Sequence, residues 1–197
     1  MKNSILVCGV GVNDGSYQAR INGKLIKEYA LWKSMIERCH DTKAHIKYPA
    51  YIGCSVSDNF LNYSYFYEWC QDQTGFGEID ASGRHWDIDK DIIIRDNKLY
   101  SEDTCVFVPH EINVFFIDRG NDRGEWPIGV SFHKASGKFS AQCSVNGKQQ
   151  NLGLFETKED AHTAYKKLKE RICRQTANKW RGKIDHRVYE AMMNWVV

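Results

Sequence analysis

The sequence predicts an α+β fold in which a module of two strands and a helix precedes a three-stranded antiparallel sheet packed on one helix, with a further helix at the C-terminus. Three observations lead to this prediction. Apolar and polar residues alternate over residues 138–145, as in a strand with one buried face. Asn146-Gly147 follows and accepts the positive φ angles of a hairpin turn. A helical stripe of apolar residues begins after Thr157.

Two helices are expected in the first part of the chain. The first lies near residues 28–40, because Leu31, Trp32, Met35 and Ile36 stand at helical spacing. The second covers residues 63–71, where aromatic residues gather on one face. A core is expected to contain Trp32, Met35, Phe66, Trp69, Ile88 and Val106.

A strand, a loop, a second strand and a helix are then predicted in order. The first strand reads from His85 to Ile94 and the second from Cys105 to Pro109. The helix opens just after Pro109 and runs from His110 to Asp118.

The sheet that follows is expected to have one apolar and one polar face. Phe139, Ala141, Cys143 and Val145 alternate with Lys138, Ser140, Gln142 and Ser144. Thr157 is a predicted N-cap, with Asp160 three residues later. The stripe of the following helix is Ala161, Ala164, Tyr165, Leu168 and Ile172. A second core is expected from Phe139, Cys143, Leu152, Ala164, Tyr165 and Leu168.

The polar, glycine-containing segment near residues 118–124 is predicted to be a linker. The expected organisation is therefore a first domain at 1–118, a linker at 119–124, a sheet domain at 125–180 and a C-terminal helix at 181–197. That last helix is predicted by Ile184, Val188, Ala191, Met192 and Trp195, which stand on one helical face.

Charge is unevenly distributed along the chain. The net charge of the 197 residues is only +2, which alone indicates no nucleic-acid partner. Residues 124–183, however, contain 12 lysines and arginines against 5 acidic residues, a net charge of +7, so the remainder carries −5. A basic module joined to a mildly acidic one fits a DNA-binding domain attached to another domain.

Several classes of protein are disfavoured. No run of 18 apolar residues and no signal peptide is apparent, so we expect no membrane association. Seven cysteines without tandem spacing indicate a reducing compartment. Cys39, His40, Cys54 and Cys105 lack the spacing of a zinc site, and we do not expect zinc.

The polar sheet face favours DNA as a ligand, because the major groove admits β-strands as well as helices. The same segment, with Gly129-Val130, Gly137-Lys-Phe-Ser-Ala141 and Leu152-Gly-Leu-Phe155, resembles the APETALA2-type DNA-binding domain. The resemblance implies a groove-facing role for the strands. Phosphate contacts are expected from Lys134, Lys138 and Lys148, and contacts to base edges from His133, Gln142, Gln149 and Asn151. The DNA-binding residues so predicted are Ser131, His133, Lys134, Lys138, Ser140, Gln142, Ser144, Lys148, Gln149 and Asn151.

The strand–loop–strand–helix segment resembles the ββα-metal, or HNH, nuclease module. Asp87-x-Asp-Lys-Asp91, Tyr100-Ser-Glu-Asp-Thr-Cys105 and Ile112-Asn113 carry this resemblance. Together the two segments are similar to HNH homing endonucleases of tailed phages, and the similarity extends over nearly the whole chain. It implies a divalent cation, Mg²⁺ or Mn²⁺, held by Asp89 and Asn113.

The implied active site is incomplete. Lys90 stands where the family has its general-base histidine, and Thr104 stands where an asparagine orients that base. A lysine is a poor base near neutral pH unless its pKa is strongly lowered. His85 or His110 would have to act as the base instead.

The expected function is a site-specific DNA endonuclease of homing type with a degenerate active site, whose partner is double-stranded DNA. The alternative is a repressor or occupancy factor that binds DNA without cutting it, and a third reading is an interaction protein that binds no DNA. By resemblance the chain would act in the cytoplasm of an infected bacterial host. We expect a monomer or weak dimer.

Overall fold

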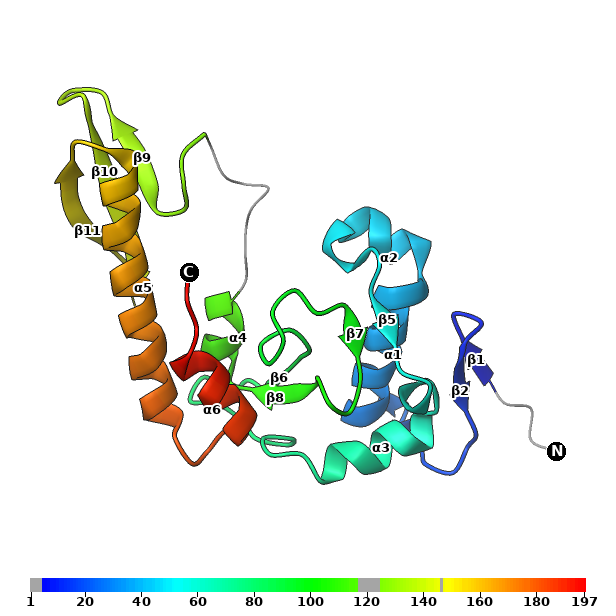
Figure 1. Ribbon diagram of the computed structural model, residues 1–197. Helices are drawn as coiled ribbons and strands as arrows, with labels where there is room; N and C mark the ends of the chain where they lie inside the picture. Colours follow the sequence, from blue (N-terminus) through cyan, green and yellow to red (C-terminus); the bar gives the residue numbers. More distant parts are fainter. Residues whose placement is uncertain (1–4, 117–124, 146) are drawn as a thin grey trace. The chain divides into compact units, whose positions relative to one another are not determined.

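The computed structural model describes residues 5–116, 125–145 and 147–197 (Figure 1). The chain divides into two compact units. Unit 1 comprises Met1–Asn113 with Lys183–Val188, and unit 2 comprises Val114–Gly182 with Tyr189–Val197. The predicted linker at 119–124 lies outside the described residues. No helix in the described ranges is both long and apolar enough to cross a membrane.

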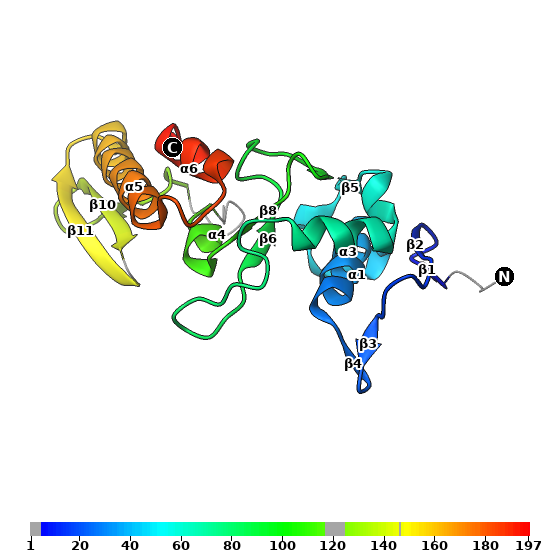
Figure 2. The ribbon, with the colours of Figure 1, turned by 90° about the horizontal axis from the view of Figure 1, so that it is seen from below.

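Unit 1 begins with two hairpins, β1 (Ile5–Val7) with β2 (Gly11–Asn13) and β3 (Arg20–Ile21) with β4 (Lys24–Leu25). The second hairpin extends away from α1 (Lys27–His40) in Figure 2. Helix α1 confirms the helix predicted near residues 28–40. The short helices α2 (Thr42–Lys47), η1 (Pro49–Tyr51) and η2 (Asn59–Leu61) and strand β5 (Ser55–Val56) follow before α3.

Helices α1 and α3 (Tyr63–Gln71) form the core of unit 1, and α3 has the bounds predicted for it. The α3 N-terminus is capped by Asn62, whose side chain accepts a hydrogen bond from the amide of Tyr65. Trp32 is fully buried and donates from Nε1 to the carbonyl of Phe60 at 2.8 Å. Of the predicted core, Trp32, Met35, Phe66 and Val106 are buried, whereas Trp69 and Ile88 are partly exposed.

Strands β6 (Asp87–Asp89) and β8 (Val106–Val108) pair antiparallel, with Asp87 opposite Val108 and Asp89 opposite Val106. Helix α4 (His110–Phe116) follows β8 directly, and β7 (Leu99–Tyr100) pairs with β5 instead. The first predicted strand, His85 to Ile94, was too long. The chain turns at Asp89, whose Oδ1 accepts the amides of Asp91 and Ile92 at 2.8 and 2.9 Å. This side-chain turn competes with continued strand pairing.

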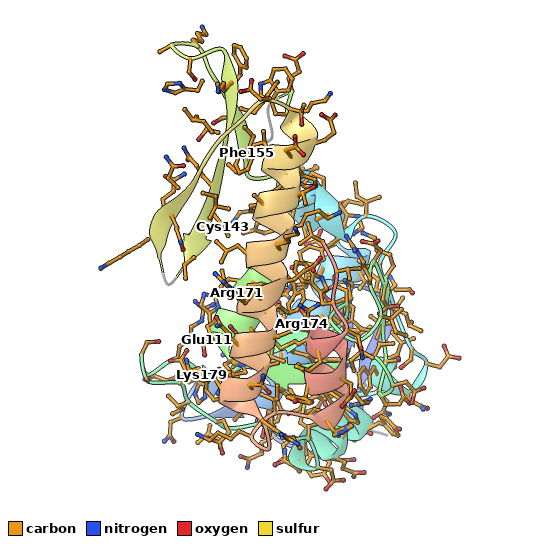
Figure 3. All side chains as sticks on the ribbon, turned by 60° about the vertical axis from the view of Figure 1, so that its left-hand side comes forward. Glu111, Cys143, Phe155, Arg171, Arg174 and Lys179 are labelled. Atoms are coloured by element: carbon orange, nitrogen blue, oxygen red, sulfur yellow. The ribbon has the colours of Figure 1, made fainter. Side chains whose placement is uncertain are left out.

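Unit 2 contains the predicted three-stranded antiparallel sheet packed on a long helix. Strands β9 (Val130–His133), β10 (Lys138–Val145) and β11 (Lys148–Phe155) have the order β11-β10-β9. Helix α5 (Lys158–Trp180) lies along one face of the sheet, toward which Cys143 points (Figure 3). Tyr165 and Leu168 of α5 are buried against Cys143 in the core of this unit.

The N-terminus of α5 is closed as predicted. Thr157 Oγ1 accepts the amide of Asp160 at 3.1 Å and donates to its carboxylate at 2.7 Å. Each residue thus satisfies a polar group of the other, in the manner of a capping box.

The predicted C-terminal helix is present as α6 (His186–Met193). Ile184, Val188 and Met192, three members of the predicted apolar stripe, are buried. Within unit 2, the Trp195 ring stacks edge-to-face on those of Phe115 and Phe116, at 5.4 and 5.6 Å between centroids. The tail is therefore packed beyond residue 183.

Candidate functional site

The first candidate site is the face of the β9–β11 sheet turned away from α5. The strand register places Ser131 opposite Ser140, Gln142 opposite Asn151 and Ser144 opposite Gln149. Because cross-strand partners share a face, these side chains lie together. We call this surface the polar face and define it by Ser131, His133, Lys138, Ser140, Gln142, Ser144, Gln149 and Asn151.

Two glutamines form the centre of the polar face. Gln149 Nε2 donates to Gln142 Oε1, and Gln142 Nε2 lies 3.5 Å from Ser140 Oγ. Ser140 is only 5% exposed, so it supports Gln142 and is not itself presented to a ligand. Gln149 is exposed and Gln142 is half-buried, and the remaining donor and acceptor positions of these two amides are those with which a side chain reads base edges.

A β-bulge shapes the same surface. The pairing of β10 with β11 shifts register between Ala141 and Gln142, which leaves Leu152 without an opposite residue. Leu152 packs on the core beneath the sheet. Asn151 Oδ1 accepts the amide of Gly153 at 2.9 Å, so this side chain is partly engaged in holding the bulge. Bulges of this kind redirect side chains at binding surfaces.

The predicted phosphate contacts are spread around the polar face. Lys134 is exposed in the turn after β9, whereas Lys138 forms an ion pair with Glu156 at 2.5 Å. Lys148 pairs with Val145 and belongs by register to the opposite face, at the end of the hairpin.

Much of the positive charge of this segment lies on α5. Lys167 and Arg174 are exposed there, and Figure 3 shows Arg171 and Lys179 along the same helix. The +7 charge of residues 124–183 is thus carried largely by α5 and is not concentrated on the polar face.

The second candidate site lies where β6 meets the start of α4, within unit 1. Asp87 Oδ2 accepts two hydrogen bonds, from His110 Nδ1 at 2.7 Å and from Asn113 Nδ2 at 3.0 Å. Arg84 completes the group, with Nη1 3.1 Å from His110 Nε2 and Nη2 3.5 Å from Asp87 Oδ1. We call these four residues the Asp87 cluster.

Opposing effects set the ionisation of Asp87. Burial alone would raise the pKa of this carboxyl group. The hydrogen bonds from Asn113 and His110 and the charge of Arg84 outweigh burial and lower the pKa below its ordinary value. The carboxylate is therefore ionised near neutral pH and holds the two donors in place.

Asp89 and Lys90, the predicted catalytic pair, occupy a different setting. Burial and the charge of Asp91 raise the pKa of Asp89 to about 7. Lys90 is buried and bound to Asp91 at 2.8 Å. Burial would lower the pKa of Lys90, but its hydrogen bond and charge interaction with Asp91 raise the pKa overall. A protonated, ion-paired ammonium cannot accept a proton, which argues against Lys90 as a base.

Of the other residues predicted for this site, some belong to the Asp87 cluster and some do not. His110 and Asn113 belong to the Asp87 cluster, whereas His85 is exposed and bridges backbone to Ile79. Thr104 is buried and donates to the carbonyl of Leu99 at 2.8 Å, a structural role in its loop.

The two predicted metal ligands, Asp89 and Asn113, make their hydrogen bonds to different partners. A hard cation requires carboxylate oxygens that are free to bind it. Asp89 Oδ1 already accepts two backbone amides, and Asn113 donates to Asp87, whose other oxygen faces the Arg84 guanidinium. Among the described residues, no group of three or more His, Cys, Asp or Glu side chains has the geometry of a metal site. All seven cysteines are free thiols.

No family model, curated protein or solved structure matches this chain. The polar face and the Asp87 cluster are therefore the features from which a function can be argued.

Sequence reasoning missed Arg84 and Asp87 as members of the second site. A usable signal was present, because His110 and Asn113 are three residues apart and so share one helical face. Asp87 is the first residue of β6. It pairs with Val108, the last residue of β8, and β8 lies just before that helix. Choosing Asp87 over Asp89 required knowing that the strand ends at Asp89.

Proposed function

We propose that this chain binds double-stranded DNA and that the polar face enters the major groove. The observation that carries the proposal is the alignment of amide, hydroxyl and imidazole groups on one side of a sheet whose other side packs on α5. A small β-sheet fits the major groove, where glutamine and asparagine side chains pair with the edge of adenine. The APETALA2-type resemblance of the same strands supports this assignment.

The basic residues beside the polar face offer few direct contacts to phosphates. Lys134 is placed to contact a phosphate beside the polar face, whereas Lys138 is paired with Glu156. The basic residues of α5 add a longer-range attraction that physiological salt screens within about 8 Å. Few direct phosphate contacts predict a shallow dependence of affinity on salt concentration.

The test is selection of duplexes from a random-sequence library by the full chain, followed by affinity measurements over a series of salt concentrations. Enrichment of a defined sequence is expected. Lys134→Ala should weaken binding to all duplexes alike and lower the salt slope by about one. Absence of binding to every duplex at low salt would contradict the proposal.

The second candidate function is DNA cleavage by unit 1, as a site-specific endonuclease of the HNH type. The observation favouring it is the Asp87 cluster, which places a carboxylate, an imidazole, an amide and a guanidinium at the junction of β6 and α4. Such groups can bind a phosphodiester and accept a proton. The competing proposal is a repressor or occupancy factor that binds DNA and leaves it intact.

Incubation of the full chain with supercoiled DNA that contains the selected sequence separates these two alternatives. The reaction should be run with Mg²⁺, with Mn²⁺ and with a chelator. Conversion of supercoiled DNA to nicked or linear forms would favour the endonuclease. Tight binding without conversion in any of the three conditions would favour the repressor.

A further inference from the structure

We propose that Lys167, Arg171 and Arg174 of α5 form a second DNA-binding surface, which holds the backbone of another duplex segment without reading its sequence. We call these three residues the basic stripe. The inference deepens the proposed function and rests on it, because the polar face is taken to hold the first duplex. The chain then bridges two stretches of DNA.

The positive charge of residues 124–183 is confined to one end of this segment. Residues 124–165, which include the whole sheet, contain four lysines, no arginine and four acidic residues, a net charge of 0. Residues 166–183 contain eight lysines and arginines and one acidic residue, a net charge of +7. The whole excess of positive charge therefore lies on the C-terminal two thirds of α5 and just after it.

The basic stripe lies on one exposed side of α5. Its members stand four and three residues apart, the spacing of neighbours on one side of a helix. Lys167, Arg171 and Arg174 are exposed, whereas Tyr165 and Leu168 of the same helix are buried against Cys143 of the sheet. Figure 3 shows Arg171 and Arg174 on this helix. At 1.5 Å per residue the stripe is about 10 Å long.

The charges of the basic stripe are poorly compensated within the helix. Glu170 is the only acidic residue from 161 to 184. Its carboxylate lies 3.8 Å from Arg174 Nη2, and the Arg174 side chain is still 44% exposed. Lys167 and Arg171 are like charges four residues apart, which disfavours a helix. Neither lies in the last turn, where the helix dipole stabilises cations, so an anionic partner would relieve this repulsion.

The backbone of duplex DNA is the anion that fits this arrangement. Its phosphates form an extended array, with one negative charge per about 1.7 Å of axis, and the cations of the stripe are likewise spread along a line. Lysine and arginine side chains that contact phosphates position a protein on DNA and read no sequence. The stripe therefore differs in chemistry from the polar face, where uncharged amides and hydroxyls predominate.

The basic stripe and the polar face cannot contact the same straight stretch of DNA. Helix α5 packs on the sheet face opposite the polar face, and the stripe lies on the part of α5 that the sheet does not cover. A duplex seated on the polar face is thus separated from the stripe by the sheet and by the helix, which is about 10–12 Å across with its side chains. The stripe stays available for a second segment.

The experiment measures capture of a second duplex by the DNA-bound chain. The duplex selected by the full chain is immobilised, the full chain is loaded on it, and a fluorescent duplex of unrelated sequence is added after washing. The quantity measured is the amount of fluorescent duplex per loaded chain, over a series of salt concentrations. The wild-type chain should capture this duplex at low salt and release it as the salt concentration rises.

The test variant is Lys167→Gln/Arg171→Gln, which removes two charges and keeps residues of similar helix propensity. Loading on the immobilised duplex shows that the variant is folded. Its capture of the second duplex should fall, and the salt slope of capture should decrease by about two, one for each lost phosphate contact. The matched control, Arg20→Gln/Lys43→Gln, changes exposed residues of β3 and α2 and should capture as the wild-type chain does.

The outcomes separate the basic stripe from the polar face. A loaded wild-type chain that captures no second duplex, or equal capture by the test variant, would overturn the inference while recognition by the polar face would stand. Binding of all duplexes alike, lost in the test variant, would contradict recognition by the polar face while the stripe would stand. A wild-type chain that binds no duplex at any salt concentration would contradict both.

Discussion

Asn113 Nδ2 donates a hydrogen bond to Asp87 Oδ2 at 3.0 Å. This contact joins α4 to the first residue of β6 and shows which of two aspartates, spaced two residues apart, belongs to the candidate catalytic site. Asp87 accepts side-chain donors and is held ionised, whereas Asp89 accepts backbone amides in the turn that ends the strand. The two aspartates stand on the same short strand, but Asp87 binds side chains of α4 whereas Asp89 binds the backbone of its own turn.

The raised pKa of Asp89 predicts an effect of pH on stability. Burial and the charge of Asp91 raise this pKa from 3.8 to about 7, so the folded state retains a proton that the unfolded state releases. The contribution of Asp89 to the free energy of unfolding should therefore fall as pH rises from about 4 to about 7 and level off above. Asp89→Asn keeps the amide acceptor and removes the titration.

Urea denaturation of the wild-type chain and of Asp89→Asn at several pH values measures this effect. Relative to wild type, the variant should gain stability between pH 4 and pH 8. Asp96→Asn, on the exposed part of the same loop, is the control. A difference between Asp89→Asn and wild type that stays constant over this range would show that Asp89 is not protonated in the folded state.

The packing of Tyr165 against Gly129 predicts a specific sensitivity. Gly129 has a φ of +77°, and a Cβ built there would lie 2.1 Å from the Tyr165 ring. Gly137 has a φ of +67°, and a Cβ there would meet no atom within 4 Å. Both Gly→Ala variants bear backbone strain, but only Gly129→Ala also overpacks the core of unit 2.

Thermal denaturation should therefore show Gly129→Ala to be less stable than Gly137→Ala, by about 1–3 kcal/mol. Equal losses of stability in Gly129→Ala and Gly137→Ala would mean that the Tyr165 ring makes room for the added methyl group without loss of packing energy.

The capping of α5 by Thr157 predicts a loss on truncation. Thr157→Ala removes the acceptor for the amide of Asp160 and should cost about 0.5–2 kcal/mol of stability. Thr163→Ala, the same change at an exposed position inside α5, should cost nothing or stabilise slightly because alanine favours helix. Chemical denaturation followed by circular dichroism gives both values. Equal effects would argue that the cap does not contribute.

Local patterns were sufficient for much of the fold. The alternation over residues 138–145, the Thr157 cap and the apolar stripe of the last helix each predict an element that the structure contains. In these segments burial, propensity and capping favour the same conformation. The turn residue Asn146 lies outside the described residues, and only the pairing of β10 with β11 is observed.

The candidate catalytic site was harder to predict, because it depends on where a strand ends. Alternating Asp87, Asp89 and Asp91 gave no sign that the Asp89 side chain would cap a turn. The position of Lys148 was equally hard to predict. Its charge favours the DNA-binding face, but the register of the hairpin pairs it with Val145 and places it on the opposite face. Long-range register and side-chain hydrogen bonds cannot be read from local periodicity.

Binding of DNA by the polar face is tested most directly by comparing Gln149→Ala with Gln150→Ala in the full chain. These residues are neighbours on β11 and both are exposed, but Gln149 lies opposite Ser144 on the polar face and Gln150 lies opposite Cys143 on the other face. The measurement is the affinity of each variant for the selected duplex, by fluorescence anisotropy at one salt concentration. Gln149→Ala should lose about 1–3 kcal/mol of binding free energy and relax the sequence preference, whereas Gln150→Ala should bind as the wild-type chain does. Equal losses in the two variants, or an effect of Gln150→Ala alone, would contradict recognition of DNA by the polar face.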